Sequence, residues 1–303
     1  MPPDPLSIFS SEISCCDTPF DALLIPPSPS ASANYPMFYD LNVPWPIPLG
    51  AGIDVKQSKK ASKKKGKEPV LEKGEPDAIS ERMDPMGLLG EEKRANLERR
   101  VEMLIHLGYS VLSFSHTVHT RIIPGVHTNP FPPTSPAPFP HLDSRTVPRP
   151  KRHILQLHRL TLVLDEDSFG GNANHGITNA NVSLLSTFDI LAVRPLTETA
   201  FQSACLSLTA LAPHSIDIIS LDLASSPRLP FHLKRSTVSK ALEGGAVFEI
   251  CYTGAVSGEI GERRNLIAGA REVIRITGGK GVVLSGEVEE MMGLRGPFDV
   301  INL

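Results

Sequence analysis

Polar and ionisable side chains stand at the ends of several short apolar runs in this sequence. The set comprises Asp40, Asn42, His116, His119, Asp165, Glu166, Arg194, Asp222 and Tyr252. If the runs are parallel strands of a barrel, their carboxyl ends meet on one face and bring these side chains together. Carboxylates and histidines gathered in this way could bind a divalent metal ion and hydrolyse phosphoesters. A metal-dependent phosphoesterase is therefore one hypothesis for this chain.

This set is a poor match to a metal site. Metal-dependent phosphoesterases of this general shape carry two histidines on the first strand, where this sequence has Asp40 and Asn42. His116 and His119 form an H-x-x-H pair, but the pair flanks a proline-rich stretch. The GGKG segment at 278–281 precedes a predicted strand, the reverse of a P-loop. We therefore predict no metal site, no catalytic residue and no cofactor, and expect the acidic residues to form a hydrogen-bonded network.

Basic residues on the same face suggest a different chemistry. Arg194 ends one apolar run, and the other candidates follow two later runs at Arg228, Lys234, Arg235, Arg263 and Arg264. Together they could form one positive rim, and arginine is well suited to phosphate groups of RNA. The alternative is that they are independent surface charges or partners of nearby acids. We name these six residues as the candidate RNA-binding set.

The elements that would position these residues alternate between strand and helix. Apolar runs predict strands at 38–43, 110–115, 159–166, 188–193, 217–221, 246–251, 281–284 and 298–302. Helical spacing predicts helices at 91–107, 197–211, 234–242, 259–276 and 287–292. Eight strands joined by helical crossovers predict an α/β fold, a TIM-like (β/α) barrel without a final helix after Asn302. An open, doubly wound sheet is the alternative.

Three segments interrupt or precede this pattern. Residues 1–36 are rich in Pro and Ser and are predicted to be a disordered leader, with Met37 as an alternative start. Residues 54–90 are a Lys-rich insertion, either a solvated segment or a nuclear-localisation or RNA-tethering patch. Residues 124–150 contain nine prolines and are predicted to be extended and mobile. The barrel domain is assigned to 37–303.

Composition narrows the function classes. The formal net charge of −3 argues against a protein that coats nucleic acid, so any RNA contact is expected to be local. The four cysteines lack the spacing of a zinc site or a disulfide framework, which favours a reducing compartment. No apolar run reaches the roughly 18 residues of a transmembrane helix, and no membrane partner is expected.

Several blocks of the sequence resemble a known family. They are DLNVPW at 40–45, LGY at 107–109, RLTLVLDE at 159–166, FDILAVRP at 188–195, DIISLDLA at 217–224, RLPFHLKR at 228–235, FEICY at 248–252, RRNLIAGAREVIR at 263–275 and LRGPFDVINL at 294–303. Their order is similar to that of the thirty-kilodalton protein subunit of ribonuclease P, shared with RNase MRP, in its eukaryotic, fungal-like form.

The resemblance implies a barrel similar to the PHP phosphoesterases but without their metal ligands. It also implies a subunit that supports RNA-catalysed 5′ maturation of precursor tRNA, or rRNA processing in the MRP particle. The implied partners are ribonuclease P RNA, MRP RNA, precursor tRNA and other protein subunits, including a small partner subunit. The implied location is the nucleus, in particular the nucleolus. The leader, the Lys-rich insertion and the missing last helix depart from the family's pattern.

Overall fold

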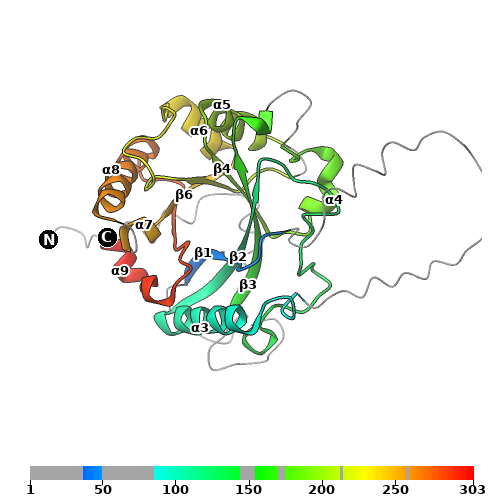
Figure 1. The fold of residues 1–303 in the computed structure, drawn as a ribbon. Coiled ribbons are helices and arrows are strands. Elements are labelled where there is room, and N and C mark those ends of the chain that lie inside the picture. Colours follow the sequence, from blue (N-terminus) through cyan, green and yellow to red (C-terminus); the bar gives the residue numbers. More distant parts are fainter. Residues whose placement is uncertain (1–36, 50–84, 144–153, 170–174, 212–213, 257–258) are drawn as a thin grey trace, which may run out of the picture.

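The computed structural model describes residues 37–49, 85–143, 154–169, 175–211, 214–256 and 259–303. Seven parallel strands lie side by side in the order of the sequence and curve into a nearly closed barrel (Figure 1). The strands are β1 (Phe38–Pro44), β2 (Tyr109–His119), β3 (Leu155–Leu164), β4 (Ile190–Pro195), β5 (Ile218–Leu221), β6 (Val247–Cys251) and β7 (Val282–Ser285). The predicted TIM-like barrel is confirmed, with seven strands among the described residues where eight were predicted.

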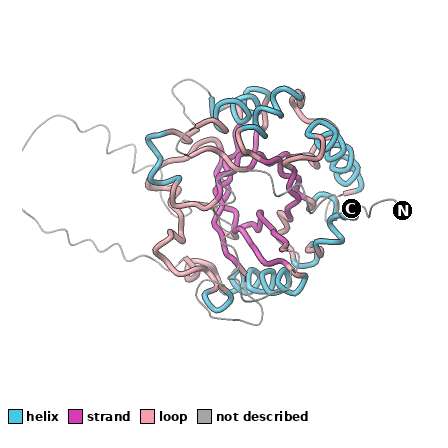
Figure 2. Tube along the Cα trace, turned by 180° about the vertical axis from the view of Figure 1, so that it is seen from behind, coloured by secondary structure: helices cyan, strands magenta, loops and turns pink. Residues whose placement is uncertain are grey.

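Helices form the outer layer around the strands (Figure 2). They are α3 (Glu91–Leu107), α4 (Val182–Leu185), α5 (Glu198–Ser203), α6 (Arg235–Glu243), α7 (Thr253–Val256), α8 (Ile260–Thr277) and α9 (Pro297–Ile301). A π-helical turn, η5 (Ala204–Leu208), continues α5, and short 3₁₀ turns are η2 (Pro140–Leu142), η3 (Asp167–Phe169), η4 (Asn179–Asn181) and η6 (Met291–Gly293). Apolar side chains of the helices pack against the outer faces of the strands.

The last segment of the chain differs from the prediction. Residues 298–302, predicted as an eighth strand, form the helix α9 and end in a turn, because Pro297 at the first helical position and Asp299 in the first turn favour a helix start. The predicted absence of a final helix is therefore also wrong. α9 lies in the outer ring between α8 and α3 (Figure 1), and Phe298 packs edge-on against Phe38 of β1 at 5.2 Å. The helix predicted at 287–292 is only the turn η6.

Two hydrogen bonds from backbone amides join the chain after β7 to β1. The amide of Gly286 donates to the carboxylate of Asp40 over 3.0 Å, and the amide of Glu287 donates to the carbonyl of Asn42 over 2.9 Å. A side chain at position 286 would meet the Asp40 carboxylate at 2.6 Å, so this approach requires glycine. The barrel is thus closed next to Asp40 and Asn42, the first-strand residues considered above as part of a metal site.

The proline-rich segment was predicted to be extended and mobile, and its described part, 124–143, is instead packed. Phe131 and Phe139 are buried, and Gln156 of β3 accepts from the amide of Phe139 and donates to its carbonyl. Phe131 also packs edge-on against Trp45 at 5.2 Å. Proline prevents regular helix here, but it does not prevent aromatic burial. This segment covers β2 and β3 in place of a helix.

Other predictions fall on residues outside the described part of the chain. These are the leader at 1–36, residues 54–84 of the Lys-rich insertion and residues 144–150 of the proline-rich segment. Within the described part, no helix combines the length and the apolar character that a bilayer crossing needs.

Candidate functional site

A buried ion pair occupies the interior of the barrel. Arg159 of β3 and Glu249 of β6 form a bidentate pair, with nitrogen-to-oxygen distances of 2.5 and 2.7 Å, and both side chains are 0% exposed. Arg159 also donates to the carbonyl of Leu41 in β1 and to Thr161. Burial alone would raise the pKa of Glu249, but Arg159 overcomes this and holds that pKa below its ordinary value. The pair therefore stays ionised and ties three strands together.

Asp40 and Asn42 belong to the same network. The amide group of Asn42 donates to Glu249 over 3.4 Å, and Asp40 accepts from the backbone amides of Asn42 and Gly286. Burial raises the pKa of Asp40, because the charged carboxylate loses water there. These contacts confirm the expected hydrogen-bonded network for Asp40.

The mouth of the barrel carries a second ion pair. Arg194 at the end of β4 donates to Glu287 over 2.5 Å and to the hydroxyl of Ser220 over 3.2 Å. The two charged side chains are 20% and 29% exposed. Burial would lower the pKa of Arg194, but Glu287 raises it above the ordinary value. Arg194 is thus bonded within the protein, which separates it from the other members of the basic set.

The two histidines of the H-x-x-H pair do not converge. They lie within β2 rather than beyond it, and residues three apart in a strand point to opposite faces. His116 is buried on the outer side of the barrel, stacked against His158 at 5.8 Å and close to Trp45 at 5.5 Å, whereas His119 is exposed. The predicted gathering of both histidines on the face with the carboxylates is therefore wrong.

The remaining polar candidates shape loops. Asp165 accepts from Thr120 over 2.6 Å, and Asp222 accepts from Ser225. The hydroxyl of Tyr252 accepts from the amide of Arg295 over 3.4 Å. Glu166 is exposed on the surface. Among the residues that the structure describes, no three His, Cys, Asp or Glu side chains are grouped in a way that could hold a metal ion.

The other five basic candidates lie on the outside, in two segments that touch. Arg228, Lys234 and Arg235 come from the loop between β5 and α6 and the start of α6; Arg263 and Arg264 come from the first turns of α8. The side chain of Asn265 on α8 donates to the carbonyl of Ala224 over 3.1 Å, which joins the two segments. We call these five residues the basic rim.

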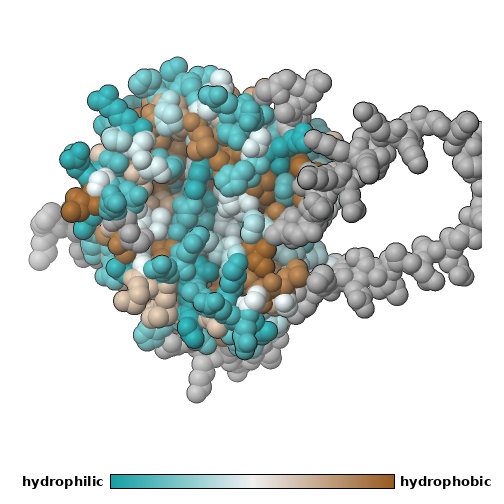
Figure 3. Space-filling model, viewed as in Figure 1, coloured by the Kyte–Doolittle hydropathy of each residue, from teal (hydrophilic) through white to brown (hydrophobic). Residues whose placement is uncertain are grey.

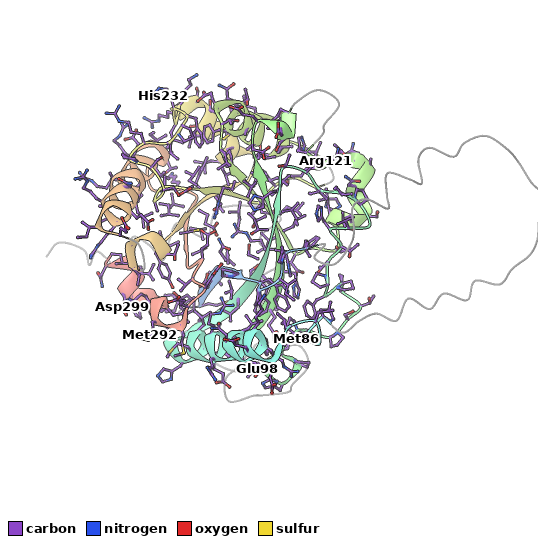
Figure 4. The ribbon with its side chains drawn as sticks, in the orientation of Figure 1. Met86, Glu98, Arg121, His232, Met292 and Asp299 are labelled. Atoms are coloured by element: carbon purple, nitrogen blue, oxygen red, sulfur yellow. The ribbon has the colours of Figure 1, made fainter. Side chains whose placement is uncertain are left out.

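The basic rim is accessible to a ligand. All five side chains are exposed, and His232 of the same loop lies at the outer edge of the ring in Figure 4. Lys234 approaches Glu198 at 3.8 Å while remaining 61% exposed. In the described ranges, no ion pair joins the other four residues to an acidic side chain. The arrangement suits phosphate binding, because unpaired arginine side chains present several donors to an anion.

The sequence analysis missed Arg159 and Glu249 as a pair. Glu249 is the only charged residue in the apolar run FEICY, and Arg159 opens the run RLTLVLDE, which the structure extends back to Leu155 so that Arg159 becomes an interior strand position. A charge at an interior strand position is expensive unless it is paired, so each run pointed to an unknown partner. That partner can be identified only when it is known which side chains of both strands point into the barrel.

Comparison with known proteins gives consistent matches. The family model described as RNase P subunit p30 matches residues 37–303. Ribonuclease P protein subunit p30 of Mus musculus is 31% identical over 204 residues, covering 67% of this chain and 69% of that protein. Probable ribonuclease P protein subunit 3 of Schizosaccharomyces pombe is 29% identical over 211 residues, covering 70% and 77%. Ribonuclease P/MRP protein subunit RPP1 of Saccharomyces cerevisiae is 27% identical over 210 residues, covering 69% and 64%.

Among solved structures, a chain of the cryo-EM structure of archaeal ribonuclease P with mature tRNA is similar with a TM-score of 0.42. Its sequence identity is 11%, and the match covers 67% of this chain and 75% of that chain. This likeness is too distant to support a conclusion beside the matches in sequence.

Proposed function

We propose a function from one premise: the chain belongs to the ribonuclease P subunit p30 family. It is a protein subunit of ribonuclease P and supports the 5′ maturation of precursor tRNA by the RNA of the particle. The match of the family model to residues 37–303 is the observation that carries this conclusion. The metal-dependent phosphoesterase considered from the sequence is not supported by the relatives, which are named as ribonuclease P subunits.

The geometry supports a role in binding rather than in catalysis. The polar groups inside the barrel bond to one another through the Arg159–Glu249 pair, whereas the basic rim presents charges outward. We propose that Arg228, Arg235, Arg263 and Arg264 contact RNA phosphates, with Lys234 as a weaker contributor because Glu198 is near. Arg194, bonded to Glu287, is proposed to hold the barrel mouth in place and not to bind RNA directly.

Finer aspects are part of the same proposal. A shared role in RNase MRP and in rRNA processing is supported by the name of the Saccharomyces cerevisiae relative, a subunit of both particles. The partners are then ribonuclease P RNA, MRP RNA, precursor tRNA and further protein subunits. A nuclear, nucleolar location accords with this role and with the Lys-rich insertion after β1.

The test replaces the rim in the full chain and measures RNA binding. Arg228→Ala with Arg235→Ala is expected to weaken binding to the particle's RNA and to reduce the salt dependence of the dissociation constant by about one to two phosphate contacts. Arg275→Ala is the matched control, because Arg275 is exposed on α8 but already paired with Glu272 at 2.6 Å. Equal salt slopes for the rim variant and the control would remove these residues from the RNA contact.

A further inference from the structure

The outer surface of α8 carries a repeat of exposed isoleucines. Ile260, Ile267 and Ile274 follow one another at seven-residue intervals and are 91%, 40% and 48% exposed. A seven-residue step drifts by only about 20° around a helix, so the three side chains form one line, which we call the isoleucine stripe. Figure 3 shows hydrophobic surface at the outer edge of the molecule over the position of α8 in Figure 1.

The stripe is separate from the face that holds α8 on the barrel. The buried residues Leu266 and Val273 stand one position before Ile267 and Ile274, so the stripe lies about 100° around the helix from the buried line. Asn265, on the opposite flank, bonds to the loop after β5. The stripe therefore faces away from that loop and is not needed to anchor α8.

The flank of the stripe that faces solvent is basic. Arg264 and Arg271 repeat at the same seven-residue interval. In the part of the chain that the structure describes, neither forms an ion pair with an acidic side chain. A line of apolar residues at this spacing with charges beside it is the pattern by which one helix binds another. The charges favour a partner with carboxylates, since opposite charges beside the seam select the partner.

We propose that the isoleucine stripe binds a helix of another protein, one with apolar residues at seven-residue spacing and acidic residues facing Arg264 and Arg271. A second copy of this chain fits poorly, because antiparallel pairing centred on Ile267 places Arg271 opposite Arg263 of the other copy. The proposal stands on α8 alone and holds whether or not the RNA contacts proposed above are correct. Arg264 belongs to the basic rim as well as to the flank of the stripe, so only Arg271, which lies outside the rim, distinguishes the two surfaces.

The test places a photo-crosslinking amino acid at position 271 of the full chain in its own cells. A cross-link to an acidic helical segment of one protein is expected. Cross-links only to RNA, only to a second copy of this chain, or to no protein would overturn the proposal. Arg271→Glu is expected to abolish binding to the cross-linked protein. Replacing the acidic residue of that partner that faces position 271 with lysine is expected to restore the binding. Failure of this restoration would also overturn the proposal.

Substitution of the stripe provides an independent measurement. Ile260→Ser with Ile267→Ser is expected to lower the yield of that cross-link about tenfold, because two apolar contacts are lost. Leu206→Ser is the control, since Leu206 is 51% exposed on a different helical segment. An unchanged yield in the isoleucine variant would overturn the proposal. The single variant Ile260→Ser is expected to leave the free energy of unfolding unchanged, because Ile260 is 91% exposed, so it separates lost binding from lost stability.

Discussion

Charge has opposite surroundings in the interior of the barrel and on its basic rim. Inside, Arg159 and Glu249 are fully buried and satisfy each other. On the rim, Arg228 and Arg263 are exposed, and no ion pair joins them to another described residue. A buried charge must have a partner in the protein, whereas an exposed charge is solvated by water and stays free to bind a ligand. The difference separates residues that hold the fold from residues whose charges remain exposed to solvent.

The interior itself has an apolar and a polar level. Side chains from five strands form an apolar cluster around the axis: Leu41, Val111, Leu157, Ile190, Ala192 and Ile218, with Val247 and Val283 packed beside them. Beyond it, Ser115 bonds to Thr161 over 3.0 Å, and the Arg159–Glu249 pair follows on the same inner faces. Many barrel interiors are filled with branched apolar side chains throughout. This one is filled in part by a polar network built around the Arg159–Glu249 pair.

The largest expected effect comes from breaking the interior pair. Glu249→Gln leaves Arg159 buried without its counter-charge, so we expect the free energy of unfolding to fall by about 3–5 kcal/mol. Urea unfolding followed by circular dichroism measures this change. The double variant Arg159→Met with Glu249→Leu is expected to lose less than the single variant, because neither charge then remains. A loss below about 1 kcal/mol for Glu249→Gln would contradict the role assigned to the pair.

A second carboxylate, Asp217, sharpens the comparison because no arginine of the described residues forms an ion pair with it. It accepts a hydrogen bond from the amide of Leu191 over 2.8 Å, and burial raises its pKa to about 6. The folded protein therefore binds this proton more tightly than the unfolded chain does. The stabilisation is complete below pH about 4 and is lost as the pH rises through about 6, by about 3 kcal/mol.

The pH dependence of Asp217 is measured by urea unfolding between pH 4 and pH 7. Asp217→Asn is expected to remove this part of the slope, because the amide keeps an oxygen acceptor for Leu191 but does not titrate. A slope that is the same in the variant and in the unaltered chain would show that Asp217 does not cause it.

A smaller effect is expected at the barrel mouth. Arg194→Ala removes the bonds to Glu287 and Ser220, but Glu287 is 29% exposed and can regain water. We expect a loss of about 1 kcal/mol in the free energy of unfolding, measured in the same denaturation series. A loss as large as that of Glu249→Gln would mean that the mouth, and not the interior, closes the barrel.

The sequence was sufficient for the barrel but not for its last segment. Strands β3 to β6 come from apolar runs bounded by turns, which local pattern predicts well. At 298–302, Phe298, Val300 and Ile301 suit a short strand or one turn of helix equally, and Pro297 decides between them. The prediction for the proline-rich segment was wrong for a related reason. Proline predicts an irregular backbone, and only the packing of Phe131 and Phe139 shows that the segment is ordered there.

The candidate site divides in the same way. The position of the basic rim could be predicted from the sequence, because its residues follow strand ends and need no partner in the protein. Arg194 resembled them in sequence, and only the position of Glu287 in space shows that its charge is paired. His116 and His119 were misplaced because β2 extends to His119 and turns the two side chains to opposite faces. Pairings across the barrel depend on register and facing, which local pattern does not determine.

The smallest effect on stability is expected on the rim. Arg228→Ala with Arg263→Ala should change the free energy of unfolding by less than about 0.5 kcal/mol, because exposed charges without partners contribute little. The same variant is expected to weaken RNA binding, so stability and binding change independently on the rim. At Glu249 the opposite is expected: the substitution lowers stability directly, and any loss of RNA binding should follow from unfolding. A rim variant that unfolds as easily as Glu249→Gln would remove the distinction, since its charges would then be structural.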